Sequence, residues 1–370
     1  MSKKNIVIVG GGSGGANAAR ALSRTLDSSN YQLILINPLP YRIWLVGTLR
    51  AIVTNDETLK NDVMISYDKV FVNGNGKFVE GTVKSFEATK EGGTVTLESG
   101  EKIDYHVLVL AQGMSWTGPP AFPRTDDGVK EHISTLHGQL SKANDIVLVG
   151  GGAVGIELAG EIKDQWPNKK VTIVHGDKHL MNDAYPVKYR KAAEASVLAR
   201  DIKLVLDDFV DHAGTGPVNG ITTRSGKELV GADLVVQTRG PRPNTEFVSA
   251  SLGPAALSEK GLIRIRPTMQ LAEYDNIFAA GDVIDWQEQK QAAKSSAHGL
   301  LVAANIQAYL NKGTLKPYKG ASEMIVVTNG KAGGFGYLGI LWGITLGAWF
   351  ARMVKSKTLL IPMFKAEQGL

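Results

Sequence analysis

Two glycine-rich segments have the spacing that binds the phosphates of a dinucleotide. They read VIVGGGSGG from Val7 and VLVGGGAVG from Val147. The first glycine of such a segment makes a tight turn, the second lets the backbone approach a pyrophosphate, and the third lets helix and strand pack closely. The anion then contacts unpaired N–H groups at a helix N-terminus. Two dinucleotides are therefore expected, on Gly10, Gly12 and Gly15 and on Gly150, Gly152 and Gly155.

The residue that ends the second strand of each unit faces the adenosine ribose, and an acid there rejects a 2′-phosphate. Asn37 occupies this place in the first unit and can hydrogen-bond a ribose, which suits flavin adenine dinucleotide (FAD). In the second unit His175, followed by Lys178, supplies no carboxylate, so NADPH is expected to bind as well as NADH. The alternative is that His175 is a partly exposed strand-end residue without influence on the cofactor.

Two acids have candidate roles in the chemistry. Asp282 ends the segment YDNIFAAGD, where it can accept a hydrogen bond from a ribityl hydroxyl. The alternative for Asp282 is a plain helix N-cap. Glu157 follows the second loop and can relay protons or orient the nicotinamide. The alternative for Glu157 is the ordinary preference for acids in the first turn of a helix.

Composition excludes several classes of enzyme. The sequence has no cysteine, which rules out thiol redox chemistry, thiolate metal sites and iron–sulfur ligation within these residues. Its seven histidines lack metal-ligand spacing, so no metal site is predicted. The net charge of +5 fits an anionic partner, but no basic, aromatic-rich stretch occurs, so nucleic-acid binding is not expected.

These residues require strand–turn–helix units to position them. Strands are predicted at 6–9, 32–36 and 107–110, a helix at 16–26, and an antiparallel meander between 77 and 103. A linker is predicted at 118–128, a second unit at 146–175, another meander before 233–240, a strand at 274–282 and a helix at 289–310. The fold class is α/β.

The apolar run from Tyr337 to Phe350 is too short to cross a bilayer. If it is helical, Gly339, Gly343 and Gly347 share one face, and Trp342 and Trp349 share another. Aromatic residues beside Arg352, Lys355 and Lys357 suit an anionic membrane surface. The alternative is a buried helix in a C-terminal domain. Position 2 is serine, whereas N-myristoylation needs glycine there. Neither a signal nor a transit peptide is recognised.

With these motifs in place, the sequence resembles the two-dinucleotide flavoproteins, and most closely the apoptosis-inducing-factor-like branch that contains the ferroptosis suppressor type of NAD(P)H:quinone oxidoreductase. The resemblance rests on VIVGGGSGG, TLRA at 48–51, DYHVLVLAQG, GGGAVGIELAGEIK with VTIVHG, IFAAGD and the 352–357 region. It implies two Rossmann-like domains arranged as in glutathione reductase, with FAD bound by 1–120 and 245–312, NAD(P)H by 121–244, and a small C-terminal domain at 313–370.

The resemblance also implies roles for single residues. Arg50 and Val79 would contact FAD, Glu157 would lie by flavin and nicotinamide, and Lys365 would pack toward the isoalloxazine. The remaining candidate cofactor contacts are Ser13, Gly14, Ala111, Gly113, Ala153, Gly240 and Val283. The sequence departs from the wider pattern at Asn37, where an acid is usual, and at Gln112, where threonine is usual.

The predicted activity is hydride transfer from NADH or NADPH to FAD, followed by transfer of two electrons to a quinone or another small acceptor outside the chain. One alternative is a reductase for monodehydroascorbate or a small redox protein. A second is a binding or signalling flavoprotein with affinity for DNA. The protein is expected to be cytoplasmic, free or bound peripherally to a membrane or lipid droplet, as a monomer or homodimer.

Overall fold

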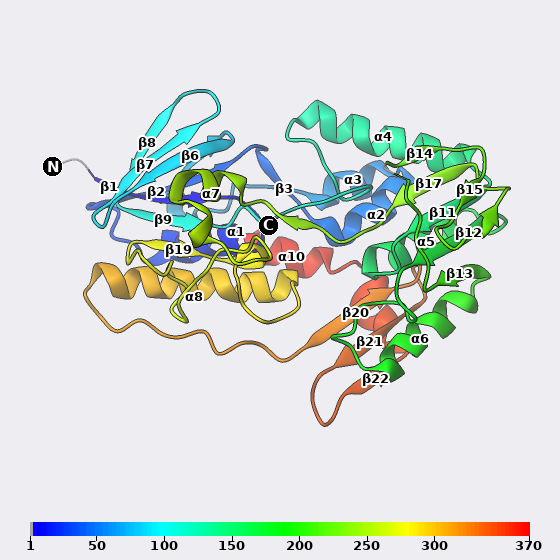
Figure 1. Ribbon diagram of the computed structural model, residues 1–370. Coiled ribbons are helices and arrows are strands. Elements are labelled where there is room, and N and C mark those ends of the chain that lie inside the picture. The colour runs from blue at the N-terminus through cyan, green and yellow to red at the C-terminus, as the bar shows by residue number, and fades with distance from the viewer. Residues whose placement is uncertain (1–2, 213) are drawn as a thin grey trace.

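The computed structural model describes residues 3–212 and 214–370. Met1, Ser2 and Ala213 lie outside the described residues, and so does the prediction about position 2. The described residues form two five-stranded sheets, two three-stranded sheets and three two-stranded ones, with helices around them (Figure 1).

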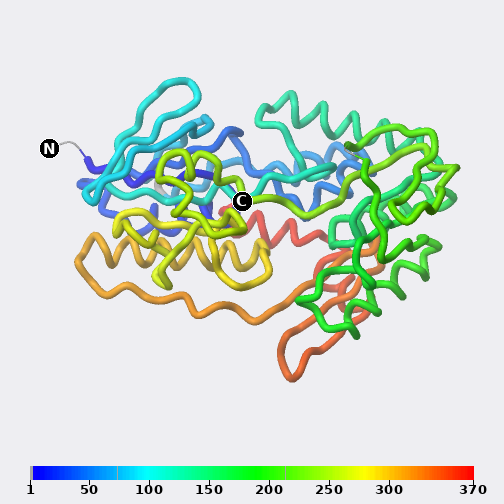
Figure 2. The backbone as a smooth tube through the Cα atoms, in the orientation of Figure 1, coloured from blue at the N-terminus to red at the C-terminus, as the bar shows by residue number. Residues whose placement is uncertain are grey.

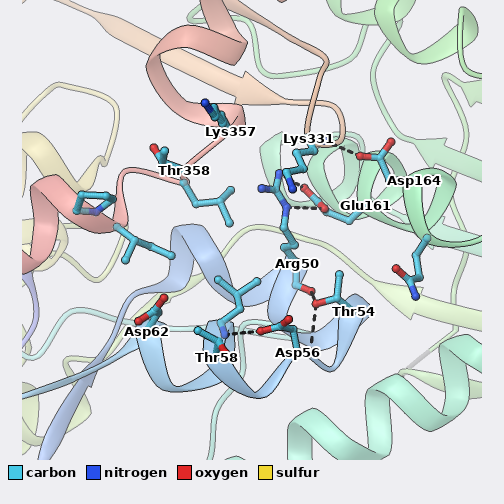
Figure 3. Close-up of a pocket in the computed structure, with 15 residues that line it drawn as sticks. Arg50, Thr54, Asp56, Thr58, Asp62, Glu161, Asp164, Lys331, Lys357 and Thr358 are labelled. Atoms are coloured by element: carbon cyan, nitrogen blue, oxygen red, sulfur yellow. Dashed lines mark hydrogen bonds and ion pairs between the residues drawn. The ribbon is translucent and has the colours of Figure 1, made fainter.

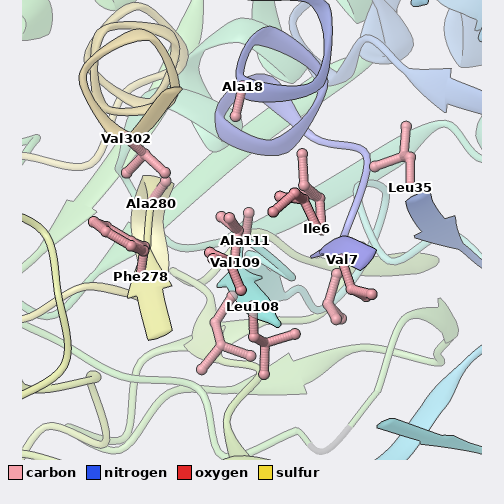
Figure 4. Close-up of a cluster of buried hydrophobic side chains, with 14 of the residues drawn as sticks. Ile6, Val7, Ala18, Leu35, Leu108, Val109, Ala111, Phe278, Ala280 and Val302 are labelled. Atoms are coloured by element: carbon pink, nitrogen blue, oxygen red, sulfur yellow. The ribbon is translucent and has the colours of Figure 1, made fainter. Parts of the chain in front are cut away.

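Five parallel strands form the first sheet in the order β19–β9–β1–β2–β5. They are β1 (Lys4–Val9), β2 (Tyr31–Asn37), β5 (Lys77–Glu80), β9 (Val107–Leu110) and β19 (Ile277–Ala279). The central strands are apolar and buried, as strands of a doubly covered parallel sheet must be. Helices α1 (Ser13–Thr25) and α8 (Ala292–Leu310) pack against each other over one face of the sheet (Figure 4). The first dinucleotide unit is thus assembled from two distant stretches of chain.

The predicted meander is confirmed in part. An antiparallel sheet consists of β6 (Val83–Ala88), β7 (Gly93–Leu97) and β8 (Lys102–Tyr105), and its apolar side chains join the core of the first sheet. The segment at 77–80 instead becomes β5 and extends the parallel sheet, because its residues pair with β2 from Ile34 to Asn37.

The second sheet repeats the strand–loop–helix arrangement. Its order is β13–β12–β11–β17–β14, with only the edge strand β14 antiparallel. The strands are β11 (Asp145–Val149), β12 (Lys170–His175), β13 (Ile202–Leu206), β14 (Gly216–Pro217) and β17 (Leu234–Gln237). Its helices are α4 (Asp126–Lys142), α5 (Ala153–Gln165) and α6 (Val187–Leu198). The predicted linker at 118–128 therefore ends early, because Thr125 caps α4 by accepting a hydrogen bond from Gly128 N.

A sheet in the C-terminal part of the chain is antiparallel and contains β20 (Met324–Thr328), β21 (Gly334–Leu338) and β22 (Ile344–Leu346). After it come α9 (Ala348–Ala351), the π-helical turn η4 (Arg352–Ser356) and α10 (Ile361–Gln368). The condition of a helix over 337–350, on which the shared glycine and tryptophan faces depend, is not met. The run forms a hairpin in which Leu338 pairs with Ile344, so its glycines share no helical face.

The remaining elements are short and connect the larger ones. They are α2 (Leu45–Thr54), α3 (Glu57–Val63), α7 (Glu246–Leu252), β3 (Tyr41–Ile43), β4 (Met64–Ser66), β10 (Met114–Ser115), β15 (Ile221–Thr222), β16 (Glu228–Leu229), β18 (Arg242–Pro243), η1 (Val72–Gly74), η2 (Pro254–Ala256) and η3 (Gly281–Val283). Figure 2 shows that the chain returns to the centre of the molecule at its C-terminal end, where α10 contacts α1.

Candidate functional site

The two glycine loops adopt the same backbone geometry. Gly10 has a φ of 97° and Gly150 a φ of 128°, both in the region that side chains rarely enter. A Cβ on Gly10 would lie 2.5 Å from the carbonyl oxygen of Ala111, and one on Gly150 would lie 2.7 Å from that of Thr238. Each turn therefore needs a glycine, and each loop packs tightly against the next strand of its sheet.

Both loops leave open space where a phosphate would bind. A Cβ built on Gly12 or on Gly152 meets nothing within 4 Å. These two glycines are also the N-caps of α1 and α5, and neither helix has a side-chain cap. The first N–H groups of both helices are thus available to an anion, as a dinucleotide site requires.

The residue that ends the second strand braces the loop in each unit. Asn37 Oδ1 accepts a hydrogen bond from Gly11 N at 3.0 Å, and His175 Nδ1 accepts one from Gly151 N at 3.1 Å. Asn37 Nδ2 also donates to the Leu39 carbonyl at 2.9 Å. Asn37 and His175, which were predicted to contact a ribose, thus hold the neighbouring glycine loop in place.

A residue that the sequence interpretation missed lies beside the first loop. Arg42 is 5 % exposed and donates through Nη2 to Ser13 Oγ, while its Nη1 has no partner among the described residues. The guanidinium stacks over the ring of Phe364 at 3.8 Å. Burial lowers the pKa of Arg42 to about 10, so it stays charged at neutral pH. A buried cation with a free donor fits an anionic group at this loop.

Further polar groups around the first loop also lack partners. Both amide atoms of the Gln112 side chain are buried without a hydrogen bond among the described residues. Tyr67 donates to the Gly11 carbonyl at 2.8 Å and closes the loop from the other side. Because buried polar atoms are normally paired, these groups fit a polar cofactor such as FAD.

Asp282 lies in η3, directly after β19. Its Oδ1 accepts a hydrogen bond from Ser295 Oγ at 2.7 Å, and burial raises its pKa above the ordinary range. The alternative role as the cap of the next helix is wrong, because the N-cap of α8 is Gln291. Asp282 therefore remains a candidate acceptor for a ribityl hydroxyl, and its neighbour Val283 is fully buried.

Glu157 is the fifth residue of α5, not a first-turn acid. Its side chain is buried and meets the C-terminal part of the chain. Glu157 Oε1 accepts from Lys355 Nζ at 2.6 Å and from Thr328 N at 3.0 Å. Lys355 lies in the π-helical turn and also donates to the Val326 carbonyl. π-helical turns are frequent at functional sites, and this one delivers a cation to the candidate catalytic acid.

Arg50 forms a second ion pair with α5. Its Nε and Nη2 both lie 2.8 Å from the carboxylate oxygens of Glu161, and Nη2 also donates to the Ser356 carbonyl. Burial raises the pKa of Glu161, and the guanidinium of Arg50 opposes that rise. The predicted contact between Arg50 and FAD stays a prediction, since the guanidinium is directed at α5 and η4.

The other candidate residues fall into two groups. Lys365 pairs with Asp62 at 2.5 Å and is 35 % exposed, and its predicted position by the isoalloxazine stays a prediction. Ser13, Gly14, Val79, Ala111 and Gly113 lie on or beside the first sheet near its loop, whereas Ala153 begins α5 and Gly240 is exposed after β17.

A carboxylate that the sequence analysis did not consider lies close to His175. Asp177 lies two residues beyond β12, and its Oδ2 is 3.7 Å from His175 Nε2. Arg190 Nη2 lies 3.8 Å from the same oxygen. The sequence signal for this acid is its position two residues after His175.

A cavity of about 750 Å³ lies where α2, α3, α5 and the C-terminal segment meet (Figure 3). Its apolar wall contains Leu59, Leu359, Ile361 and Pro362. Arg50 points to Glu161 at its centre, and Lys331 and Lys357 line its edge. Its acids already have partners, since Asp62 pairs with Lys365, Glu161 with Arg50 and Asp164 with Arg200, and Asp56 caps α3.

This cavity is connected to the first loop by an aromatic layer. Trp44 and Phe364 stack with their ring centroids 3.6 Å apart. Arg42 lies over Phe364 on the side of the loop, and Trp44 Nε1 donates to the carbonyl of Leu359 at 2.8 Å. Contacts therefore run without a break from Ser13 to the wall of the cavity.

Comparison with known proteins places these features in context. Residues 4–299 match the family model for pyridine nucleotide-disulphide oxidoreductases. The FAD-dependent oxidoreductase FVFD30 of Flammulina velutipes is 44 % identical over 319 residues, covering 86 % of this chain and 99 % of that protein. Apoptosis-inducing factor homolog B of Dictyostelium discoideum is 28 % identical, covering 99 % and 97 %. Ferroptosis suppressor protein 1 of Taeniopygia guttata is also 28 % identical, covering 96 % and 93 %.

Solved structures confirm the predicted fold class. The sulfide:quinone oxidoreductase of Aquifex aeolicus superposes with a TM-score of 0.77 at 18 % identity, covering 99 % of this chain and 91 % of that one. A putidaredoxin reductase gives 0.71 at 19 % identity, covering 91 % and 82 %. FAD and NAD(P)H are the cofactors that these relatives imply, in agreement with the two loops.

Proposed function

Because the chain belongs to the pyridine nucleotide-disulphide oxidoreductase family and is an FAD-dependent oxidoreductase, we propose that it is an NAD(P)H:quinone oxidoreductase of the ferroptosis suppressor type. When bound, FAD accepts hydride from the nicotinamide and passes two electrons to the acceptor. The overall reaction converts NAD(P)H, one proton and a quinone into NAD(P)⁺ and a quinol.

The cavity where α2, α3, α5 and the C-terminal segment meet carries this proposal. Its volume of about 750 Å³ suits a small molecule, and it combines an apolar wall with two lysines that form no ion pair among the described residues. A quinone ring would pack on Leu359 and Ile361. Lys331 and Lys357 would stabilise the charge that develops on its oxygens during reduction.

The composition of the chain supports an acceptor outside it. Without cysteine these residues cannot form the redox disulfide after which the family is named. The relative that is 44 % identical to this chain bears the name of an FAD-dependent oxidoreductase, which fits electron transfer through a flavin. The volume of about 750 Å³ and the apolar wall favour a small molecule as the acceptor over a small redox protein.

The chain's own residues would perform the remaining tasks. Arg42 and the uncapped start of α1 are placed to bind the pyrophosphate of FAD, and Asp282 to accept from its ribityl chain. Glu157, neutralised by Lys355, would orient the nicotinamide near the start of α5. The layer of Trp44 and Phe364 excludes water between the first loop and the cavity.

Steady-state oxidation of NADH and NADPH with menadione and a short-chain ubiquinone tests the proposal. Turnover above about one per second is expected with at least one quinone. The double substitution Lys331→Met and Lys357→Met should raise the quinone KM and leave the NADH KM unchanged. Turnover below about one per minute with every quinone, or faster turnover with monodehydroascorbate or an iron–sulfur protein, would contradict it.

A further inference from the structure

The turn of the β21–β22 hairpin exposes three consecutive apolar side chains. Ile340 is 47 % exposed, Leu341 74 % and Trp342 101 %. In Figure 1 this hairpin projects from the lower edge of the molecule, away from the cores of the first two sheets. Contiguous exposed apolar surface of this kind marks a site of interaction.

The backbone of this turn is held in an unfavourable conformation. Leu341 and Trp342 have φ values of 47° and 67°, and Gly343 follows at 92°. Left-handed backbone is rare for large side chains and clusters at binding sites. A hydrogen bond from Gly343 N to the Ile340 carbonyl at 2.9 Å closes the turn, and positive φ at both central residues is what a type I′ hairpin turn requires. The turn holds Trp342 exposed to solvent, although its left-handed backbone is unfavourable for a large side chain.

The segment that contains the hairpin has one sign of charge. Between Glu323 and Glu367 the sequence holds five basic residues and no acid. Lys355 and Lys365 are paired with Glu157 and Asp62, but Lys331, Arg352 and Lys357 are exposed and form no ion pair among the described residues. Trp349 and Met353, 77 % and 60 % exposed, lie next to Arg352. An anionic surface therefore complements this part of the molecule.

We propose that the hairpin turn Ile340–Trp342 inserts into the interfacial layer of an anionic lipid bilayer, with Arg352 contacting the headgroups. Tryptophan favours this layer because its ring is apolar and its N–H remains able to hydrogen-bond. Insertion needs no spanning helix. Among residues 3–212 and 214–370, no helix is long and apolar enough to cross a membrane.

A second copy of the chain is a poorer occupant. A stable protein interface buries roughly 800 Å² on each partner. A large aromatic side chain contributes at most about 250 Å², so three partly covered residues on a narrow turn do not reach that area. A bilayer accepts a small apolar wedge without requiring a complementary surface.

Vesicle sedimentation with the FAD-loaded protein tests the inference independently of any acceptor. Vesicles of phosphatidylcholine with about 30 % phosphatidylserine should bind the protein, and rising salt should weaken binding. Trp342→Ser should lower the bound fraction about tenfold, and Arg352→Gln should lower it less. Val230→Ser is the matched control, because Val230 is 78 % exposed in the turn after β16, remote in the chain from the hairpin.

A second measurement guards against an indirect effect of the substitution. Phosphatidylcholine with brominated acyl chains should quench tryptophan fluorescence in the native protein, and the quenching should fall in Trp342→Ser with the flavin content unchanged. Equal binding by Trp342→Ser and the native chain would overturn the proposal. So would a concentration-dependent dimer that Trp342→Ser abolishes in the absence of lipid.

Discussion

The two dinucleotide loops share their backbone and differ in what surrounds them. Gly10 and Gly150 make the same turn, and Asn37 and His175 accept the same hydrogen bond. The first loop is enclosed by Tyr67 and by Arg42, which is itself covered by α10. The second loop ends beside partly exposed His175 and exposed Asp177. An enclosed loop suits a cofactor that stays bound, and an open one suits a cofactor that exchanges.

The polar atoms around the loops show the same difference. Arg42 and Gln112 leave buried donors and acceptors unpaired beside the first loop among the described residues. At the second loop, His175 and Thr238 both have hydrogen-bond partners. Unpaired buried groups cost free energy until a ligand satisfies them. The first site thus leaves buried groups for a ligand to satisfy, as the predicted FAD would, whereas the groups named at the second are already paired.

The largest expected effect removes the acid of the enclosed site. Asp282→Ala should weaken FAD binding about 100-fold, because a buried carboxylate that accepts from a ligand hydroxyl contributes about 1.5–3 kcal/mol. The visible absorbance of purified protein and titration of the apoprotein with FAD measure this loss. Full flavin content in the variant would refute the assignment of the enclosed site.

Asp282→Asn separates binding from folding in the same experiment. Burial raises the pKa of Asp282, so the apoprotein loses stability as the pH rises through that pKa and the carboxyl ionises. The Asn variant carries no such charge. Its apoprotein should melt at a higher temperature than the native apoprotein at neutral pH, and the gap should close toward about pH 4. If the Asn variant binds flavin less tightly while its apoprotein is more stable, the weaker binding results from the lost contact with FAD and not from misfolding.

A smaller effect is expected at the contact between the second unit and the C-terminal segment. Glu157→Gln should slow turnover about 10- to 100-fold with FAD retained. Lys355→Met should slow it about tenfold, because it leaves Glu157 buried without its partner. Stopped-flow reduction by NADH measures the step directly, and Lys355→Arg should restore part of the rate.

Arg352→Met is the matched control for this contact, since Arg352 lies in the same π-helical turn but is exposed. It should leave reduction by NADH unchanged. If Lys355→Met reduces the rate no more than Arg352→Met, Lys355 has no role in positioning Glu157.

Sequence spacing predicted the parts of both sites that are local. The glycines, Asn37 and His175 lie within one strand–loop–helix unit each, so their positions follow from the motif. Lys355 and Glu157 are 198 residues apart, and Arg42 meets Phe364 from the other end of the chain. No spacing rule encodes such contacts. The hairpin at 337–350 was missed because short apolar runs rich in glycine do not distinguish strand from helix.

The smallest expected effect concerns Asp177, at the open site. An acid near the ribose repels a 2′-phosphate, so the native protein should prefer NADH. Because Asp177 is 60 % exposed and solvent screens its charge, Asp177→Asn should raise kcat/KM for NADPH relative to NADH only about five- to tenfold. The gain should shrink at high salt. Asp183→Asn, an exposed acid after the same strand, should leave the ratio unchanged. A ratio that is insensitive to Asp177 would mean that the open loop binds its cofactor without sensing the ribose, and that the difference between the two loops lies only in their enclosure.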